Sequence, residues 1–234
     1  MATGSEVRIL TIVPTRGRGD NAKRLYDQIN ATAYCTELVF AIDNDDMKTY
    51  RDLMDELQGV NNAKVVVADS MGMNATLNHW AKWFAPDYDY ICFMGDDHLP
   101  ITKNWDILLA TAIGDKPGIA YGDDLLQGEN LPTAVMMSAE IVQALGFMAP
   151  PALHHLFMDN FWLALGKGLG NCTYLPEVII EHLHFINGKA PADERYMAVN
   201  NADIHNADQQ VFMDYQPQLE KDIEVVREYS HHRA

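Results

Sequence analysis

Residues 95–100 attach two carboxylates and an imidazole to the end of a short apolar run, in the order Gly-Asp-Asp-His-Leu-Pro. If this segment is extended, Asp96 and His98 are spaced i, i+2, so both side chains face one side and can hold a divalent cation together. Asp97 would then point away from the cation, toward a hydroxyl of a ligand. The alternative interpretation is a polar turn after a strand, because Asp and Pro are common in turns.

The preceding residues, 90–94, are apolar and aromatic, which predicts a strand buried on both faces. Gly95 lets the backbone turn sharply where this strand leaves the sheet. The acids therefore follow the carboxyl end of the strand. In open α/β sheets ligands bind at that end, because the loops there form a crevice. We expect a ligand site at this edge of the sheet.

A Gly-containing basic loop, residues 14–19 (Pro-Thr-Arg-Gly-Arg-Gly), lies between a predicted strand and a predicted helix that Asp20 can cap. Its backbone amides and Arg16 or Arg18 can bind a diphosphate. The loop lacks the third glycine of a dinucleotide fingerprint and the Lys-Ser/Thr of a P-loop. A plain strand-to-helix turn is an equally good interpretation.

A second polar loop, residues 43–46 (Asp-Asn-Asp-Asp), ends the next predicted strand at the same edge. A carboxylate there can accept hydrogen bonds from a base or a ribose, and we assign this role to Asp43. At least one of these acids should instead cap the following helix, for which Asp46 is the best candidate.

Three residues in the second half of the chain add chemistry. His182 and His184 alternate on a predicted strand, so both can face one cleft and one of them can complete a metal site; a structural role is an equally good interpretation. Asp159 opens a predicted helix close to Trp162, where it is either an N-cap or a general base.

The apolar pattern of residues 7–115 alternates strands with helices, which implies right-handed crossovers and a mainly parallel, Rossmann-like sheet. The predicted strands are 7–13, 38–42, 64–68 and 90–94, and the predicted helices are 20–32, 49–57 and 74–85. Residues 116–234 look mixed and loop-rich, with predicted strands 118–121, 133–137 and 178–184 and predicted helices 138–146, 159–165 and 208–229. Residues 187–206 have little apolar periodicity and predict a mobile lid.

Composition bounds the class of protein. The chain of 234 residues is 48% hydrophobic, which is enough for the core of one domain. Its net charge of −16 disfavours nucleic acid as a partner bound through its phosphate backbone. Three widely spaced cysteines indicate neither a disulfide framework nor a structural zinc site. Without a signal peptide or a run long enough to cross a bilayer, a soluble cytoplasmic protein is expected.

Taken in order, these segments resemble the GT-A fold glycosyltransferases, most closely the family-two type that uses a nucleoside-diphosphate sugar donor. The resemblance covers residues 7–185 and is carried by residues 11–16 (Thr-Ile-Val-Pro-Thr-Arg), 41–45 (Ala-Ile-Asp-Asn-Asp) and 94–98 (Met-Gly-Asp-Asp-His), the last in place of an Asp-x-Asp motif. It implies an α/β fold with helices on both faces of a mainly parallel sheet. A single domain, 1–234, would comprise a nucleotide-sugar half, 7–115, and a mixed acceptor-side half with C-terminal helices.

For the donor, the resemblance implies Mn²⁺ or Mg²⁺ at the acidic motif, neutralising the departing diphosphate. The implied metal ligands are Asp97, His98 and His182, and Asp96 would contact ribose or metal. The implied nucleotide contacts are Pro14, Thr15, Arg16, Asp43 and Asp45. The histidine at the third motif position departs from the usual pattern and also occurs in retaining enzymes of this fold.

For the reaction, residues 158–162 (Met-Asp-Asn-Phe-Trp) resemble the segment that carries the general base in inverting members, which assigns that role to Asp159. The expected activity is transfer of a hexose-type sugar, from a UDP-sugar by preference, to an acceptor hydroxyl of a glycan, a protein or a small molecule. A modified DNA base is a further acceptor class that the charge disfavours. The alternatives are a sugar nucleotidyltransferase, which usually needs a longer first loop, and a non-catalytic carbohydrate-binding protein.

Overall fold

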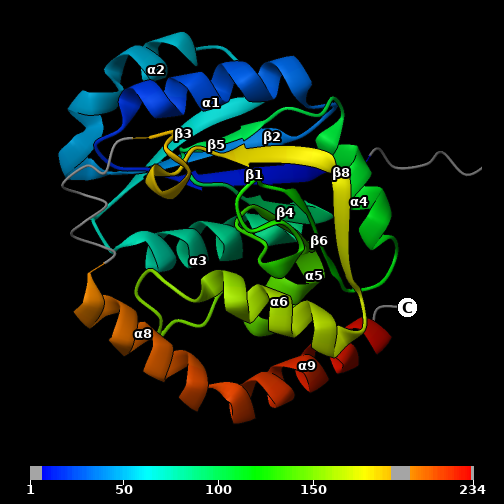
Figure 1. The fold of residues 1–234 in the computed structure, drawn as a ribbon. Coiled ribbons are helices and arrows are strands. Elements are labelled where there is room, and N and C mark those ends of the chain that lie inside the picture. The colour runs from blue at the N-terminus through cyan, green and yellow to red at the C-terminus, as the bar shows by residue number, and fades with distance from the viewer. Residues whose placement is uncertain (1–6, 191–200, 233–234) are drawn as a thin grey trace, which may run out of the picture.

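In the computed structural model, which describes residues 7–190 and 201–232, an eight-stranded sheet forms the centre of the fold (Figure 1). The strands are β1 (Ile9–Pro14), β2 (Glu37–Asp43), β3 (Ala63–Ala68), β4 (Tyr90–Phe93), β5 (His98–Pro100), β6 (Ile119–Asp123), β7 (Val135–Ser138) and β8 (Cys172–His182). They lie in the order β3-β2-β1-β4-β7-β6-β8-β5.

Helices cover both faces of this sheet. They are α1 (Gly19–Thr32), α2 (Arg51–Glu56), α3 (Met73–Phe84), α4 (Trp105–Ile113), α5 (Ala139–Leu145), α6 (Met158–Leu169), α8 (Ala202–Asp214) and α9 (Gln216–His231). Short 3₁₀ turns lie at Asn44–Tyr50, Ala85–Asp87, Gly128–Asn130 and Phe185–Asn187.

The first half of the sheet is parallel, as the alternating pattern predicts. Strands β3, β2, β1 and β4 pair in parallel, so their carboxyl ends meet at one edge. One buried cluster packs α1, α2 and α4 against the sheet, and a second packs α3, α5, α6 and α9 against it. Figure 1 shows α1 and α2 above the sheet and α3 below it. The expected α/β architecture with helices on both faces is confirmed.

The second half is mixed, which was also predicted. β7 is antiparallel to both β4 and β6, whereas β6 and β8 are parallel. β5 pairs antiparallel with β8 at the end of the sheet, and this pairing brings the loop after β4 beside the end of β8. A Cβ at Gly122 would lie 2.1 Å from the Val178 backbone oxygen, so β6 and β8 can approach this closely only because residue 122 has no side chain.

Several predicted boundaries were wrong. The single helix expected over residues 208–229 is two helices that meet at Tyr215, because Pro217 lacks an N–H and opens the second helix. Asp20 lies inside α1, whose N-cap is Arg18. Of the expected lid, residues 191–200 fall outside the described part of the chain, and residues 202–206 begin α8. Over the described ranges, no helix combines the length and apolar character needed to cross a membrane.

Candidate functional site

A cavity of about 710 Å³ lies where β1, β2 and β4 end, between the sheet edge and the loops around α6. Residues from both halves of the chain line it. From the first half come the ends of β1, β2 and β4 with the loops that follow them, the loop after β3 and the start of α3. From the second half come the loop after β6, the start of α6 with the segment that leads into it, the end of β8 with the turn after it, and one residue of α8. The cavity thus lies at the edge of the sheet where the sequence predicts a ligand site.

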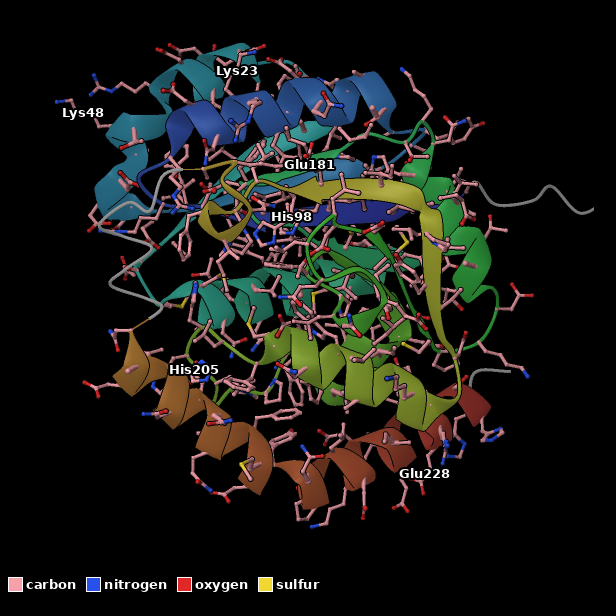
Figure 2. All side chains as sticks on the ribbon, in the orientation of Figure 1. Lys23, Lys48, His98, Glu181, His205 and Glu228 are labelled. Carbon is pink, nitrogen blue, oxygen red and sulfur yellow. The ribbon has the colours of Figure 1, made fainter. Side chains whose placement is uncertain are left out.

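Asp97, His98 and His182 each offer one ligand atom, and these atoms all lie within 4.8 Å of one another. Strand pairing produces this cluster, because His98 opens β5 directly opposite His182 at the end of β8, and their rings stack 4.3 Å apart. Asp97 Oδ1 lies 3.5 Å from His98 Nδ1 and 3.6 Å from His182 Nε2. Figure 2 shows His98 alongside β8.

The cluster fits a divalent cation. One carboxylate oxygen and two imidazole nitrogens, His98 Nδ1 and His182 Nε2, converge there, and His98 Nδ1 also accepts the Gly95 N–H at 3.0 Å. The other ring nitrogens, His98 Nε2 and His182 Nδ1, are buried with no hydrogen-bond partner among the described residues. Burial and the neighbouring His182 lower the pKa of His98 to about 3. Burial alone would raise the pKa of Asp97, but the His182 and His98 rings hold it below its usual range. A neutral imidazole beside an ionised carboxylate is the protonation state that binds metal.

The i, i+2 pairing of Asp96 with His98 was wrong. Residues 96 and 97 form a turn rather than extended backbone, so Asp97, not Asp96, joins the two histidines. Asp96 is 6% exposed, and its carboxylate accepts a 2.5 Å hydrogen bond from Thr15 Oγ1. Burial and the adjacent Asp97 raise the pKa of Asp96. Asp96 still reaches the cavity wall, but it binds mainly to the loop after β1.

A chain of hydrogen bonds joins the three loops at this edge. A carboxylate only accepts, so the Thr15 hydroxyl donates to Asp96. The Thr15 oxygen then accepts from the Tyr50 hydroxyl at 2.9 Å, and the Tyr50 oxygen accepts the Arg18 backbone N–H at 3.4 Å. Tyr50 is fully buried, and burial raises its pKa to about 12. The sequence reasoning missed Tyr50, since nothing about a tyrosine in a polar turn marks it as a link between loops.

Asp43 and Pro14 line the cavity as expected, whereas Asp45 does not. Asp43 Oδ2 accepts hydrogen bonds from Arg16 at 2.5 Å and from the Ser70 hydroxyl at 3.0 Å. The side chain of Asp45 is 56% exposed and forms a bidentate pair with Arg16, so it holds the arginine rather than a ligand. Ser70 was missed, because it follows β3, and no site was predicted at the end of that strand.

Asp46 is not the helix cap that the sequence suggested. Asp43 precedes the 3₁₀ turn at Asn44–Tyr50 and makes no side-chain cap bond. Asp46 instead accepts hydrogen bonds from the Gly17 N–H and the Thr49 hydroxyl. It therefore fixes the turn after β1, next to the residues that line the cavity.

Asp159 lies in the first turn of α6 and lines the cavity. The N-cap of α6 is Phe157, so Asp159 is not a cap. Its Oδ1 accepts the Asn160 N–H at 2.9 Å, and burial raises the pKa of the carboxyl to about 6. His184 also lines the cavity, but it lies beyond the end of β8 and outside the Asp97–His98–His182 cluster. His155 and His205 line it too, and the sequence reasoning assigned them no role.

Solved structures match this chain, whereas family models and curated sequences do not. No protein-family model matches the sequence, and no curated protein matches it. Among solved structures, 357 chains match. The mannosyltransferase PcManGT from Pyrobaculum calidifontis, in complex with GDP-Man and Mn²⁺, is 13% identical with a TM-score of 0.61, over 99% of this chain and 77% of that one.

This chain has a GT-A fold. Residues 1–349 of S. aureus TarS in complex with UDP are 12% identical with a TM-score of 0.58, over 74% of this chain and 59% of that one. The same TarS fragment in complex with UDP-GlcNAc gives a TM-score of 0.58 at 13% identity. The matched region thus spans a little over half of the TarS fragment, and the GT-A fold is what the two proteins share.

Proposed function

We propose that this GT-A protein is a metal-dependent glycosyltransferase that moves a sugar from a nucleoside-diphosphate sugar to an acceptor hydroxyl. One observation carries the proposal: Asp43, the Asp97–His98–His182 cluster and Asp159 line a single cavity. They would serve as a nucleoside contact, a cation site and a general base, which this reaction needs together. The complexes of PcManGT with GDP-Man and Mn²⁺ and of TarS with UDP-GlcNAc support the donor class and the metal.

The donor half favours a base with an N–H on its pairing edge. Arg16 and Ser70 bind one carboxylate oxygen of Asp43, Oδ2, and among the described residues none hydrogen-bonds to Oδ1, which can accept a ligand. A carboxylate can accept the N3–H of uracil or the N1–H of guanine, but it repels the N3 lone pair of cytosine. We propose UDP as the preferred nucleotide, bound between Pro14 and Asp43.

The residues around the cluster would hold the diphosphate end of the donor. Asp97, His98 and His182 supply one oxygen and two nitrogen ligands, and Mn²⁺ or Mg²⁺ bound to them would neutralise the charge that develops on the departing diphosphate. Arg18 lies 3.7 Å from Asp97 and lines the same cavity, so its guanidinium can bind a phosphate oxygen as well.

Asp159 would act as the general base. As the acceptor oxygen forms its bond to the anomeric carbon, the bond from that carbon to the diphosphate oxygen breaks, and the acceptor proton passes to the Asp159 carboxylate. A pKa of about 6 leaves this carboxylate mostly ionised at neutral pH and still basic enough to take a proton. Attack from the face opposite the leaving group inverts the anomeric configuration.

Nucleotide binding followed by thermal shift tests the proposal. UDP, GDP, CDP and dTDP are each added with and without Mn²⁺ to the wild type, to Asp97→Asn and to the control Asp87→Asn, which changes an exposed acid of the Ala85–Asp87 turn. We expect UDP to stabilise the wild type and the control only with Mn²⁺, and Asp97→Asn to lose that response. Stabilisation that is equal with EDTA, or that persists in Asp97→Asn, would contradict the metal site.

A further inference from the structure

Two loops of the acceptor-side half are each fixed by a buried carboxylate. Asp124, which is 3% exposed, follows β6 and accepts the backbone N–H groups of Leu126, Gln127 and Gly128 at 2.6–2.9 Å. Its second oxygen accepts the Thr133 hydroxyl at 2.7 Å. These bonds lower the pKa of Asp124, although burial opposes them. A loop tied by four hydrogen bonds to one carboxylate is rigid.

The second loop is held in the same way from α8. Asp208 is fully buried and accepts the N–H groups of His154, His155 and Leu156 at 2.8–2.9 Å. This loop leads directly into α6. Figure 2 shows His205, also on α8, on the side of the helix that faces the loop, and its ring lies 5.2 Å from that of Phe157.

Each loop contains a non-glycine residue in the left-handed region. The φ of Leu125 is +57° and that of Phe157 is +64°. Bulky side chains rarely adopt this conformation, which costs about 1–3 kcal/mol and persists only where the surroundings enforce it, often at ligand sites. The anchored loops therefore fix the backbone at these two residues and the directions of the side chains around them.

Apolar side chains of both loops line the cavity, beside the polar Gln127, Thr133 and His155. Leu126 and Leu131 line it from the first loop, Leu156 and Phe157 line it from the second, and Ile186, which is 66% exposed, lines it from the turn after β8. Among the described residues that line the cavity there is no lysine, and the only arginines belong to the loop after β1. In a chain of net charge −16, the described residues at this end offer a phosphate-rich ligand no permanently charged cation, only the imidazoles of His155, His184 and His205.

We infer that this apolar wall is the acceptor subsite, and that the acceptor is an uncharged molecule whose hydroxyl is carried beside an aryl or alkyl face. The inference rests on the proposed function, since Asp159 follows Phe157 by two residues and would take the proton of the bound hydroxyl. Rigid apolar side chains recognise such a face without ordering a loop on binding. Unsubstituted sugars and phosphorylated polymers lack it.

Matched acceptors test the inference. Release of UDP from UDP-glucose, UDP-galactose and UDP-N-acetylglucosamine is measured with Mn²⁺, with methyl glycosides, p-nitrophenyl glycosides and phosphorylated sugars as acceptors. We expect p-nitrophenyl glycosides to exceed methyl glycosides by about tenfold in kcat/KM. This is the factor expected when roughly 60 Å² of apolar acceptor surface leaves water, at about 25 cal/mol per Å².

Two surface variants locate the effect. Ile186→Ser changes the exposed isoleucine of the wall, and Met213→Ser changes a methionine of α8 that is 61% exposed and lies outside the cavity lining. We expect Ile186→Ser to reduce the aryl preference severalfold and Met213→Ser to leave it unchanged. Equal rates with methyl and aryl glycosides, or a preference for phosphorylated acceptors, would overturn the inference. Turnover of the donor in the same assay would still support the proposed glycosyltransferase function. Failure to bind or hydrolyse any donor would overturn both.

Discussion

Replacing Asp159 by asparagine is expected to stabilise the protein above neutral pH while removing most of its activity. The carboxyl of Asp159 lines the cavity, and burial raises its pKa from 3.8 to about 6. The folded protein therefore binds this proton more tightly than the unfolded chain does. The resulting stability is fully present below pH 3.8 and is lost as the pH rises through about 6.

The size of this loss follows from the pKa change. Raising the pKa from 3.8 to about 6 corresponds to about 3 kcal/mol, at about 1.36 kcal/mol per pKa unit. Asp159 is half-buried at the wall of an open cavity, so this value is an upper bound and about 1–3 kcal/mol is expected. Asparagine has nearly the same size and does not ionise. The free energy of unfolding of Asp159→Asn, relative to wild type, should therefore rise by this amount between about pH 4 and pH 7.5.

Urea unfolding at both pH values, in EDTA so that no cation perturbs the carboxyl, measures this difference. Asp203→Asn is the matched control, because Asp203 lies in the first turn of α8 as Asp159 lies in that of α6, but is exposed. Any loss of favourable charge at a helix N-terminus is then common to both variants. A stability difference for Asp159→Asn that does not change with pH would refute the burial argument.

The same variant separates catalysis from binding. Loss of a general base lowers kcat by about 10²–10⁴-fold. Nucleotide binding should be unchanged, because the proposed donor contacts lie on other loops of the cavity. Transfer by Asp159→Asn at more than about a tenth of the wild-type rate would show that another group takes the proton.

Three further substitutions test the packing that positions the site. Tyr50→Phe breaks the link between the Thr15 hydroxyl and the loop after β2, so we expect the free energy of unfolding to fall by about 1 kcal/mol and UDP to bind more weakly. The control Tyr90→Phe loses a hydrogen bond to the Gly114 carbonyl, so it should lower the free energy of unfolding without affecting UDP binding. Asp208→Ala leaves three N–H groups without their acceptor, and urea unfolding should show a loss of about 2–4 kcal/mol. Gly122→Ala places a Cβ against a backbone oxygen of β8, so the free energy of unfolding should fall by about 2 kcal/mol or more. A smaller decrease would contradict the close approach of β6 and β8.

The parallel half of the fold could be predicted because each strand is a short apolar run and each crossover helix is amphipathic. The pattern failed for α4, whose apolar side chains occur on all sides of the helix and give no clear 3.6-residue period. It failed for β5 as well, since three residues that end in Pro100 read as a turn. Strand pairing with β8, which no local pattern encodes, makes them a strand.

The site was predictable where its residues follow strands and was not where tertiary contacts decide. The position of Asp43 at the end of β2 follows from the strand itself, as does that of the Asp96–Asp97 pair after β4. Which of the two acids meets His98 depends on a two-residue turn that the sequence does not specify. Asp208 lies 54 residues from His154, its partner, so the local sequence gives no sign that it anchors the loop before α6.

The most direct test of the account is anomalous diffraction at the manganese edge from crystals grown with Mn²⁺ and UDP. The account predicts one strong peak bound by Asp97, His98 and His182, with the diphosphate on the same ion and the uracil against Asp43. A nucleotide elsewhere in the cavity, or a manganese peak away from these three side chains, would contradict it.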